Sequence, residues 1–362
     1  MDDSSDNMST GGTGDAGDTT DTTDTTDTGD AGVAVDVTDD VSVSTEGEYQ
    51  EWDAEEVAGS KGVDSMIGNL SGAINGIKGN NELSETEKSE TIKANINHTM
   101  REIGMSDMKP EEKVSAMKQV YGSVPEGCAK NIYVPADAKF LNESKPFDTE
   151  GRARYDWKGD LGFEGETEAC TLKSGQVVDR YGDENGAYVC EVKNGVPQDY
   201  DSRALPYEEN PEMYHQYEIV KDMDDFKSRV ENLTVEEIEQ RELQSEQSKP
   251  ESDRRSPEQI REDAEDKYFA IIYDVAKTNG WKDEYDETQL LTDDGKLRDS
   301  GLESMKETIK NEDLSSTKGK IAESFSYTDE EGVEHKRGGG EQIYLPASVD
   351  TLVYLGYMEE KK

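Results

Sequence analysis

The sequence predicts an α+β fold, built on a small, twisted, mainly antiparallel β core that a helical insertion splits in two. A helical hairpin and a disordered acidic tail precede this core. Short runs rich in Tyr and Val alternate with turn residues over 128–220, and similar runs return over 319–357. Between these pieces, and again over 62–122, apolar residues recur at helical spacing. The first 58 residues are polar and acidic instead.

The N-terminal segment contains 18 acidic residues and no Lys or Arg up to residue 58, and it repeats a Thr-Thr-Asp unit over 19–30. Low hydrophobicity and unbalanced charge leave too little apolar surface to offset the entropy lost on folding. Residues 1–60 are therefore expected to form a disordered tether.

Two helix starts define the hairpin predicted over residues 61–125. Ser84 and Glu87 have the spacing of a capping box, in which each side chain caps the backbone N–H of the other residue. Pro110 is expected in the first turn of a second helix. The hairpin either simply packs against its neighbour or serves as a delivery or docking module.

The β core is assigned to residues 126–220 and 319–362, and the helical insertion to residues 221–318. The clearest helix of the insertion follows Ser256, a predicted N-cap, with Pro257 at its first position and Gly280 at its end. Before the insertion, strands are expected at residues 131–135, 176–179, 187–192 and 215–220.

The charge balance excludes some partners. The chain has 39 Lys and Arg against 84 Asp and Glu, a formal charge of −45. Such a chain repels phosphate backbones, so no nucleic-acid partner is expected. No apolar run approaches the roughly 20 residues that span a bilayer. The N-terminus lacks the basic and apolar regions of a signal peptide, so export would use another route.

Three cysteines, Cys128, Cys170 and Cys190, cannot all pair within one chain, and they are too few for a four-cysteine zinc site. A Cys170–Cys190 bridge, a Cys128–Cys190 bridge and free thiols all remain open.

The residues that carry chemistry lie in the two β-rich pieces. Arg180 and Arg203 each lie beside a turn of an acidic protein, where they would clamp a diphosphate through bidentate hydrogen bonds. Tyr188 would stack on a planar ring. Three glycines at 338–340 let the backbone approach a ligand closely and leave Gln342 at the start of a strand. Together these residues favour a nucleotide site.

Each of these residues also has a plain structural explanation. Arg180 can pair with one of many carboxylates, the glycines can shape a hairpin, and His215 can be a core histidine. The glycine run lacks the spacing of a P-loop or of a dinucleotide-binding fingerprint.

Three blocks resemble motifs of the tuberculosis necrotizing toxin domain family, and they occur in the same order: residues 179–182 (Asp-Arg-Tyr-Gly), 203–206 (Arg-Ala-Leu-Pro) and 338–346. Arg180 is followed after 8, 23 and 35 residues by Tyr188, Arg203 and His215, intervals similar to those of the family's first half. Residues 133–140 resemble the fungal surface NADases of the same superfamily.

This resemblance implies an enzyme that cleaves NAD⁺, and NADP⁺ as well, at the nicotinamide–ribose bond; the dinucleotide is the substrate, and no cofactor is implied. Arg180 and Arg203 would hold the diphosphate or ribose side, and Tyr188 would line the nicotinamide end. His215 would support the pocket wall. Gln342 would orient the reacting ribose or the attacking water. The expected catalytic set is Gln342, Arg180 and His215, with Tyr188 and Arg203 binding substrate.

Some features depart from the family pattern. Residues 324–337 lack the Trp and Pro often found before the glycine run, and residues 328–336 are expected to form an extended loop. If the insertion displaced this loop, it would alter the pocket or gate activity. Glu341 precedes Gln342, but strand alternation points it to the opposite face, so an electrostatic role for it is the lesser alternative. Fungal members bind calcium; no such ligands are identified here, and no metal is predicted.

Two other functions are compatible with these residues. An ADP-ribosyltransferase cleaves the same bond and passes ADP-ribose to a protein, but such enzymes usually have Glu where this chain has Gln342. A binding module with a decayed pocket is the second alternative. The favoured hypothesis is a toxin or effector delivered into a target cell, with a cognate immunity protein as its partner.

Overall fold

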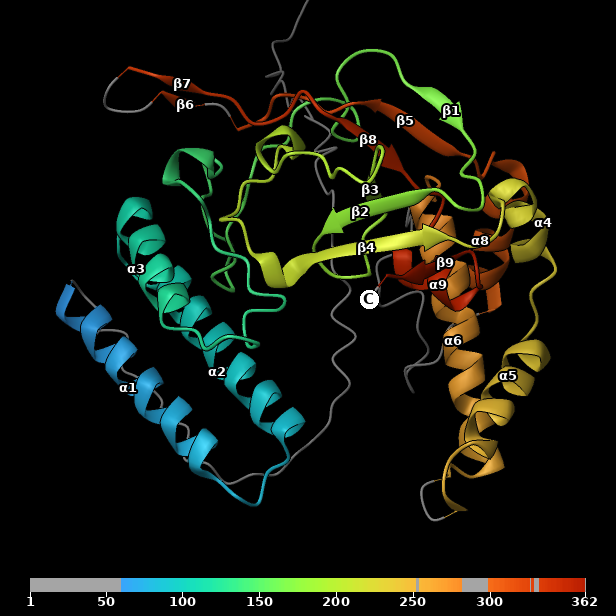
Figure 1. Cartoon of the computed structure of the whole chain (residues 1–362), viewed down its shortest axis with the longest axis horizontal. Helices are drawn as coiled ribbons and strands as arrows, with labels where there is room; N and C mark the ends of the chain where they lie inside the picture. Colours follow the sequence, from blue (N-terminus) through green and yellow to red (C-terminus); the bar gives the residue numbers. More distant parts are fainter. Residues whose placement is uncertain (1–59, 252–253, 282–298, 326, 329–331, 362) are drawn as a thin grey trace, which may run out of the picture. The chain divides into compact units, whose positions relative to one another are not determined.

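The structure is a computed structural model that describes residues 60–251, 254–281, 299–325, 327–328 and 332–361. The tether expected over residues 1–60 lies outside this part of the chain except for its last residue. The described elements combine α-helices with a seven-stranded antiparallel sheet, which confirms the predicted α+β class (Figure 1). None of the helices in the described ranges is long and apolar enough to cross a membrane.

Three helices precede the sheet: α1 (Ser60–Gly79), α2 (Glu85–Met105) and α3 (Pro110–Gly122). α2 and α3 begin where the sequence predicts, because Ser84 and Glu87 form a capping box and Pro110 is the first residue of α3. α1 adds a third helix to the expected pair. Its apolar stripe is buried in one core with α2 and α3, and the stripe consists of Val63, Met66, Leu70 and Ile74.

Seven strands form the sheet in the order β1-β5-β8-β3-β2-β4-β9. Their bounds are β1 (Glu168–Cys170), β2 (Val177–Tyr181), β3 (Tyr188–Glu191), β4 (Tyr214–Ile219), β5 (Ser316–Lys320), β8 (Glu341–Tyr344) and β9 (Met358–Glu360). β2, β3 and β4 lie at three of the predicted strand positions. β5, β8 and β9 follow the helical segment in sequence, yet they pair with β1, β3 and β4, which precede it.

The strand predicted for residues 131–135 is wrong. In this segment Pro135 forms an isolated bridge with Tyr207, and Asn131 has a left-handed φ of 64°. A left-handed residue interrupts an extended run, and proline has no N–H with which to continue a ladder.

The segment between β4 and β5 is helical in its described residues, with α4 (Phe226–Glu231), α5 (Val235–Gln247), α6 (Pro257–Thr278) and α8 (Asp299–Asn311). α6 begins at the predicted capping box of Ser256 and Gln259. Gly280, with a φ of 87°, follows its last turn. α5 and α6 lie side by side (Figure 1), and Arg261 of α6 donates to Glu239 of α5 at 3.0 Å.

Two short elements flank the glycine run. β6 (Tyr327–Thr328) pairs with β7 (Glu334–His335), so the described parts of the expected 328–336 loop include a short antiparallel ladder. The apolar tail after Pro346 folds into α9 (Val349–Tyr354), which Ser348 caps.

The two faces of the sheet are covered by different parts of the chain. On one face, Val178, Val189, Tyr217 and Ile343 pack in a core with residues of α4, α6, α8 and α9, and we call it the helix-covered face. On the other, Cys190 packs with residues that include Phe140, Ala204, Ile321 and Phe325, and we call it the loop-covered face. Successive residues of a strand point to opposite faces, so these cores fix the direction of every strand side chain.

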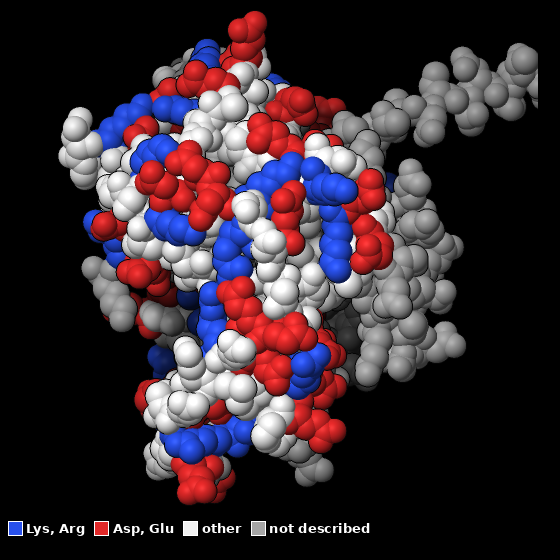
Figure 2. All heavy atoms as spheres, turned by 90° about the vertical axis from the view of Figure 1, so that its right-hand side faces the viewer, with Lys and Arg blue, Asp and Glu red and all other residues white. Residues whose placement is uncertain are grey.

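The three cysteines are free thiols, so neither of the two disulfides considered above is formed. Basic and acidic side chains lie interspersed on the face of the molecule shown in Figure 2.

Candidate functional site

The five predicted site residues come from four strands and one short helix. Arg180 lies on β2, Tyr188 begins β3, His215 lies on β4 and Gln342 lies on β8. Arg203 ends the 3-10 helix η2 (Asp201–Arg203). Four of the five positions are therefore set by the register of the sheet.

Arg180 and His215 project from the helix-covered face. They pair directly across β2 and β4, so their side chains point the same way. The next pair on this face, Val178 and Tyr217, belongs to the helix-covered core. The structure thus brings Arg180 and His215 together.

Tyr188 and Gln342 project from the opposite, loop-covered face. Tyr188 pairs with Tyr344, and Gln342 shares the face of Tyr344 because it lies two residues earlier on β8. Cys190, two residues after Tyr188, lies in the loop-covered core. The four strand residues of the predicted site therefore form two groups on opposite faces of the sheet.

Arg180 is held in a tight, buried setting at the turn between β2 and β3. Its Nη1 donates to the carbonyl of Gly186, whereas its buried Nε has no hydrogen-bond partner within the described residues. A Cβ on Gly186 would lie 2.2 Å from Arg180 Nη2, so a side chain there would displace the guanidinium. Burial lowers the pKa of Arg180, and the nearby carboxylates of Asp183 and Glu184 oppose that shift.

His215 is fixed from one side of its ring. Its Nδ1 lies 2.7 Å from Oε1 of Glu360 on β9, and its side chain is 11% exposed. The other ring nitrogen, Nε2, is buried and has no partner among the described residues, and the same is true of the Tyr217 hydroxyl. Arg180 Nε, His215 Nε2 and the Tyr217 hydroxyl together make what we call the unpaired polar cluster. Buried polar atoms nearly always have partners, so such a cluster calls for an explanation.

Arg203 is engaged by a carboxylate that the sequence analysis did not single out. Its Nη1 lies 2.7 Å from Oδ1 of Asp179, and its Nη2 donates to Oδ2 of Asp179 at 2.9 Å. Nη2 and Nε also donate to the carbonyl of Gln198. Burial alone would lower the pKa of Arg203, but the hydrogen bonds and the charge of Asp179 raise it. The free donors needed to clamp a diphosphate are thus largely occupied.

Gln342 and Tyr188 lie beside the loop at residues 159–163. The amide nitrogen of Gln342 makes a long hydrogen bond of 3.4 Å to the carbonyl of Leu161. The ring of Tyr188 lies 4.8 Å from that of Tyr344, and burial raises the pKa of Tyr188 well above its usual value. Gln342 is 9% exposed, so its amide is held in place by the sheet while only weakly bonded.

The three glycines at 338–340 lie close to other parts of the chain, which occupy the space expected for a ligand. Gly338 and Gly339 have φ values of 119° and 83°, and a Cβ on Gly338 would lie 2.5 Å from the carbonyl oxygen of Ala322. A Cβ on Gly340 would lie 2.4 Å from the side-chain amide of Gln198. The glycines therefore let β8 pass close to its neighbours, which is the structural explanation considered above.

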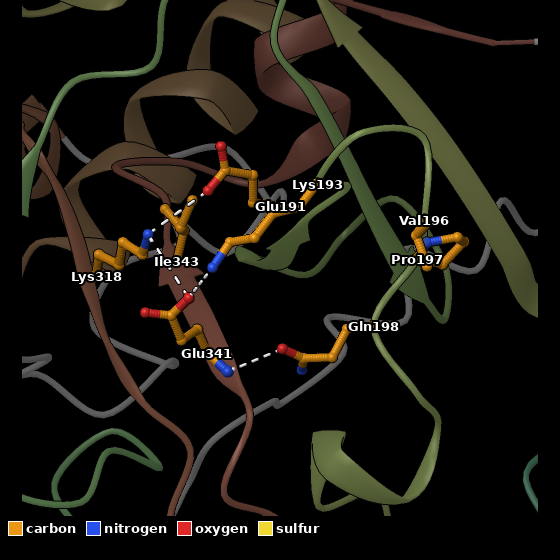
Figure 3. Close-up of a pocket in the computed structure, with 8 residues that line it drawn as sticks. All are labelled: Glu191, Lys193, Val196, Pro197, Gln198, Lys318, Glu341 and Ile343. Atoms are coloured by element: carbon orange, nitrogen blue, oxygen red, sulfur yellow. Dashed lines mark hydrogen bonds and ion pairs between the residues drawn. The ribbon is translucent and has the colours of Figure 1, made fainter.

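A surface pocket of about 240 Å³ opens next to β8 and contains none of the five predicted residues (Figure 3). Its lining residues are Glu191, Lys193, Val196, Pro197, Gln198, Lys318, Glu341 and Ile343. Glu341 pairs with Lys193 and lies 3.9 Å from Lys318, which is 3.5 Å from Glu191. Two cations offset two anions, so the pocket offers no net charge to a diphosphate. Glu341 points here and away from Gln342, as strand alternation predicts.

Sequence reasoning missed three residues of this region: Asp179, Tyr217 and Glu360. The sequence offers a signal for the first two. Asp179 is a charged residue in an apolar strand and so needs a buried partner. Tyr217 follows His215 by two residues, so it lies on the same face of the strand. Glu360 carries no local signal, because only the pairing of β9 with β4 places it beside His215. Among the described residues, no group of three or more His, Cys, Asp or Glu could hold a metal ion.

Comparison with known proteins gives one family. Residues 171–238 match the family described as tuberculosis necrotizing toxin. This match contains Arg180, Tyr188, Arg203 and His215, whereas Gln342 lies beyond it. No curated protein matches the chain. On the strength of the family match, residues 171–238, with strands β2 to β4, belong to the tuberculosis necrotizing toxin family.

Proposed function

We propose that this chain is a toxin that hydrolyses NAD⁺, and NADP⁺ as well, at the nicotinamide–ribose bond. One observation carries the proposal: the match to a toxin family spans four of the five residues predicted for such a site, all within residues 171–238. NAD⁺ is proposed as the substrate because the blocks around Arg180, Arg203 and Gln342 resemble those of an NAD⁺-cleaving family.

The reaction makes modest chemical demands. NAD⁺ and water give nicotinamide, ADP-ribose and a proton: the bond from C1′ of the ribose to the nicotinamide nitrogen breaks, and a bond from C1′ to the water oxygen forms. The nicotinamide of NAD⁺ is already cationic and leaves as a neutral molecule, so it needs no general acid, unlike the leaving oxygen of an ordinary glycoside. What the protein must supply is orientation, stabilisation of the cationic ribose and entry of one water.

Gln342 suits the orienting role. Its amide both donates and accepts hydrogen bonds, and the 3.4 Å bond to Leu161 is long enough to be exchanged for one to a ligand. Tyr188 on the same face would line the nicotinamide end with its ring. Neither residue has to change protonation state for these tasks.

Each group has one member next to the β2–β3 turn, Arg180 before it and Tyr188 after it, so one dinucleotide bound there would contact both groups. Arg180 reaches the carbonyl of Gly186, only two residues before Tyr188. A substrate lying across this turn would place its nicotinamide near Tyr188 and Gln342, and the adjoining ribose within reach of Arg180 and His215 as well. Arg203 would contribute donors to such a ligand only if its pairing with Asp179 loosened.

Loss of NAD⁺ would make the enzyme toxic to the cell that receives it. A cell that makes such an enzyme needs protection from it, so a cognate immunity protein that blocks the site is the expected partner. Delivery into a target cell is part of the same proposal.

Product analysis with the purified full chain tests the function. We expect NAD⁺ to be converted to nicotinamide and free ADP-ribose in equal amounts, with no acceptor protein required. Nicotinamide released together with ADP-ribose attached to protein would identify a transferase instead. An inert wild-type chain at micromolar concentration, with both NAD⁺ and NADP⁺, would leave a binding module as the remaining function.

A further inference from the structure

The unpaired polar cluster on the helix-covered face indicates what kind of group binds there. Arg180 and His215 are directly paired across β2 and β4, and Tyr217 follows His215 on the same face with a ring-centroid distance of 6.3 Å. Arg180 Nε, His215 Nε2 and the Tyr217 hydroxyl are all buried, and none has a partner in the described part of the chain. A buried polar atom without a partner destabilises the fold, so each of the three atoms points to a bound group.

Glu360 decides which nitrogen of His215 carries the proton. Glu360 pairs with Tyr217 in the register of β9 and β4, so it shares the face of the cluster, and its Oε1 lies 2.7 Å from His215 Nδ1. An ionised carboxylate only accepts hydrogen bonds, so Nδ1 must donate. In a neutral imidazole the second nitrogen, Nε2, is then a bare acceptor, and it is buried without a partner among the described residues.

With a neutral His215, the cluster needs one group that both donates and accepts a hydrogen bond. Arg180 Nε–H can only donate, and His215 Nε2 in this tautomer can only accept. A phosphate ester oxygen accepts alone and would leave Nε2 unpaired. The oxygen of a water or of an alcohol satisfies both, because it donates to Nε2 and accepts from Arg180 or from the Tyr217 hydroxyl.

We propose that Arg180, His215 and Tyr217 bind a hydroxyl-bearing group, either the attacking water or a ribose hydroxyl of the dinucleotide, and that Glu360 is the positioning residue that sets the His215 tautomer for it. This inference rests on the proposed function for the identity of the ligand. It replaces the expected diphosphate contact of Arg180 with a hydroxyl contact and adds Tyr217 and Glu360 to the site.

The tautomer can be measured without any activity. The full chain labelled with ¹⁵N-histidine contains three histidines, and His215→Ala assigns the His215 signals. At about pH 8, where imidazole is neutral, long-range ¹H–¹⁵N spectra should show His215 protonated on Nδ1 and bare on Nε2. Glu360→Ala should lose this preference. Glu359→Ala is the matched control, since Glu359 is the neighbouring exposed residue of β9 and faces the other way, and it should leave the spectrum unchanged. The assignment of the tautomer to Glu360 is overturned if wild-type His215 is protonated on Nε2, or if Glu360→Ala leaves the His215 spectrum unchanged.

Two variants then identify the source of the hydroxyl. Loss of one hydrogen bond to the bound group should cost about tenfold. Tyr217→Phe removes the bond of the hydroxyl, and Glu360→Ala removes the tautomer in which His215 Nε2 accepts, so each should show this effect while Glu359→Ala does not. If the group is the attacking water, kcat for NAD⁺ falls and the Kd of ADP-ribose stays constant. If it is a ribose hydroxyl, the Kd of ADP-ribose, measured by calorimetry, rises by the same factor. Variants that change neither quantity contradict the inference. An inactive wild type with the expected tautomer would instead count against the proposed function alone.

Discussion

At the scale of single residues, the buried pair of Asp179 and Arg203 joins the sheet to the turn that follows β3. Asp179 is fully buried on β2, and besides the bond from Arg203 Nη2 its Oδ2 accepts a second hydrogen bond, at 3.0 Å, from the hydroxyl of Tyr214. Arg203 also lies 5.2 Å from the ring centroid of Tyr181. Removing one member of such a pair leaves the other as a buried charge without compensation, which is far more costly than removing a surface pair.

Asp179→Asn should therefore destabilise the protein by about 3–5 kcal/mol, because Arg203 keeps its charge but loses its counter-ion. Urea unfolding, followed by circular dichroism, measures the change. Asp201→Asn is the control: Asp201 is 64% exposed and lies 3.4 Å from Arg337, so its loss should cost less than about 1 kcal/mol. Equal losses in the two variants would show that the buried pair contributes no more than a surface one.

Sequence reasoning located the candidate residues better than it located their partners. The alternation that separates Glu341 from Gln342 is a local property of one strand, and the structure has it as predicted. The partner of Arg203, by contrast, lies 24 residues away on β2. The division of Arg180 and Gln342 between two faces depends on the register of β2, β3 and β8, which contacts distant in sequence decide.

At the scale of elements, the connection between α5 and α6 is held by Arg255 and Glu246. The Glu246 carboxylate accepts from Arg255 N at 3.1 Å, Arg255 Nε at 2.8 Å and Lys249 Nζ at 2.8 Å. Arg255 also contacts Glu242 and Asp263, one on each helix. These bonds lower the pKa of Glu246 from 4.5 to about 2.

The stability contributed by Glu246 should consequently depend on pH. A carboxyl whose pKa falls on folding stabilises the protein fully above its unfolded pKa, and that contribution is lost as the pH drops through the folded pKa. The difference in unfolding free energy between wild type and Glu246→Gln should be largest near pH 7 and shrink between about pH 4.5 and pH 2. Urea titrations at several pH values measure it. A difference that stays constant over this range would show that Glu246 is not held ionised by these bonds.

The sequence predicted elements well where a local signal marks their ends. The capping boxes at Ser84 and Ser256 identify the starts of α2 and α6. The strand prediction for residues 131–135 failed because it followed the apolar composition of the segment. It did not take account of the left-handed residue Asn131 and the missing N–H of Pro135. Short strands and bridges of this kind depend on tertiary contacts more than on propensity.

At the scale of the whole molecule, the sheet joins strands from both sides of the helical segment. β8 lies between β5 and β3, and β9 pairs with β4, so Gln342 and Glu360 reach the segment that matches the toxin family only through long-range pairing. Sequence alone indicates two β-rich pieces, but it cannot give the order of strands between them, because each pairing closes a loop of more than 100 residues.

Nicotinamide release from NAD⁺ by the wild-type chain and by Gln342→Ala, measured side by side, tests whether the chain hydrolyses NAD⁺ and whether Gln342 takes part. Gln342 is only weakly bonded within the protein, so its replacement should leave the fold intact, and an unchanged urea midpoint verifies this. We expect wild type to release nicotinamide and the variant to be at least about a hundredfold slower, which corresponds to about 3 kcal/mol of transition-state stabilisation. A wild type that leaves NAD⁺ and NADP⁺ intact, or a folded variant as fast as wild type, would contradict this expectation.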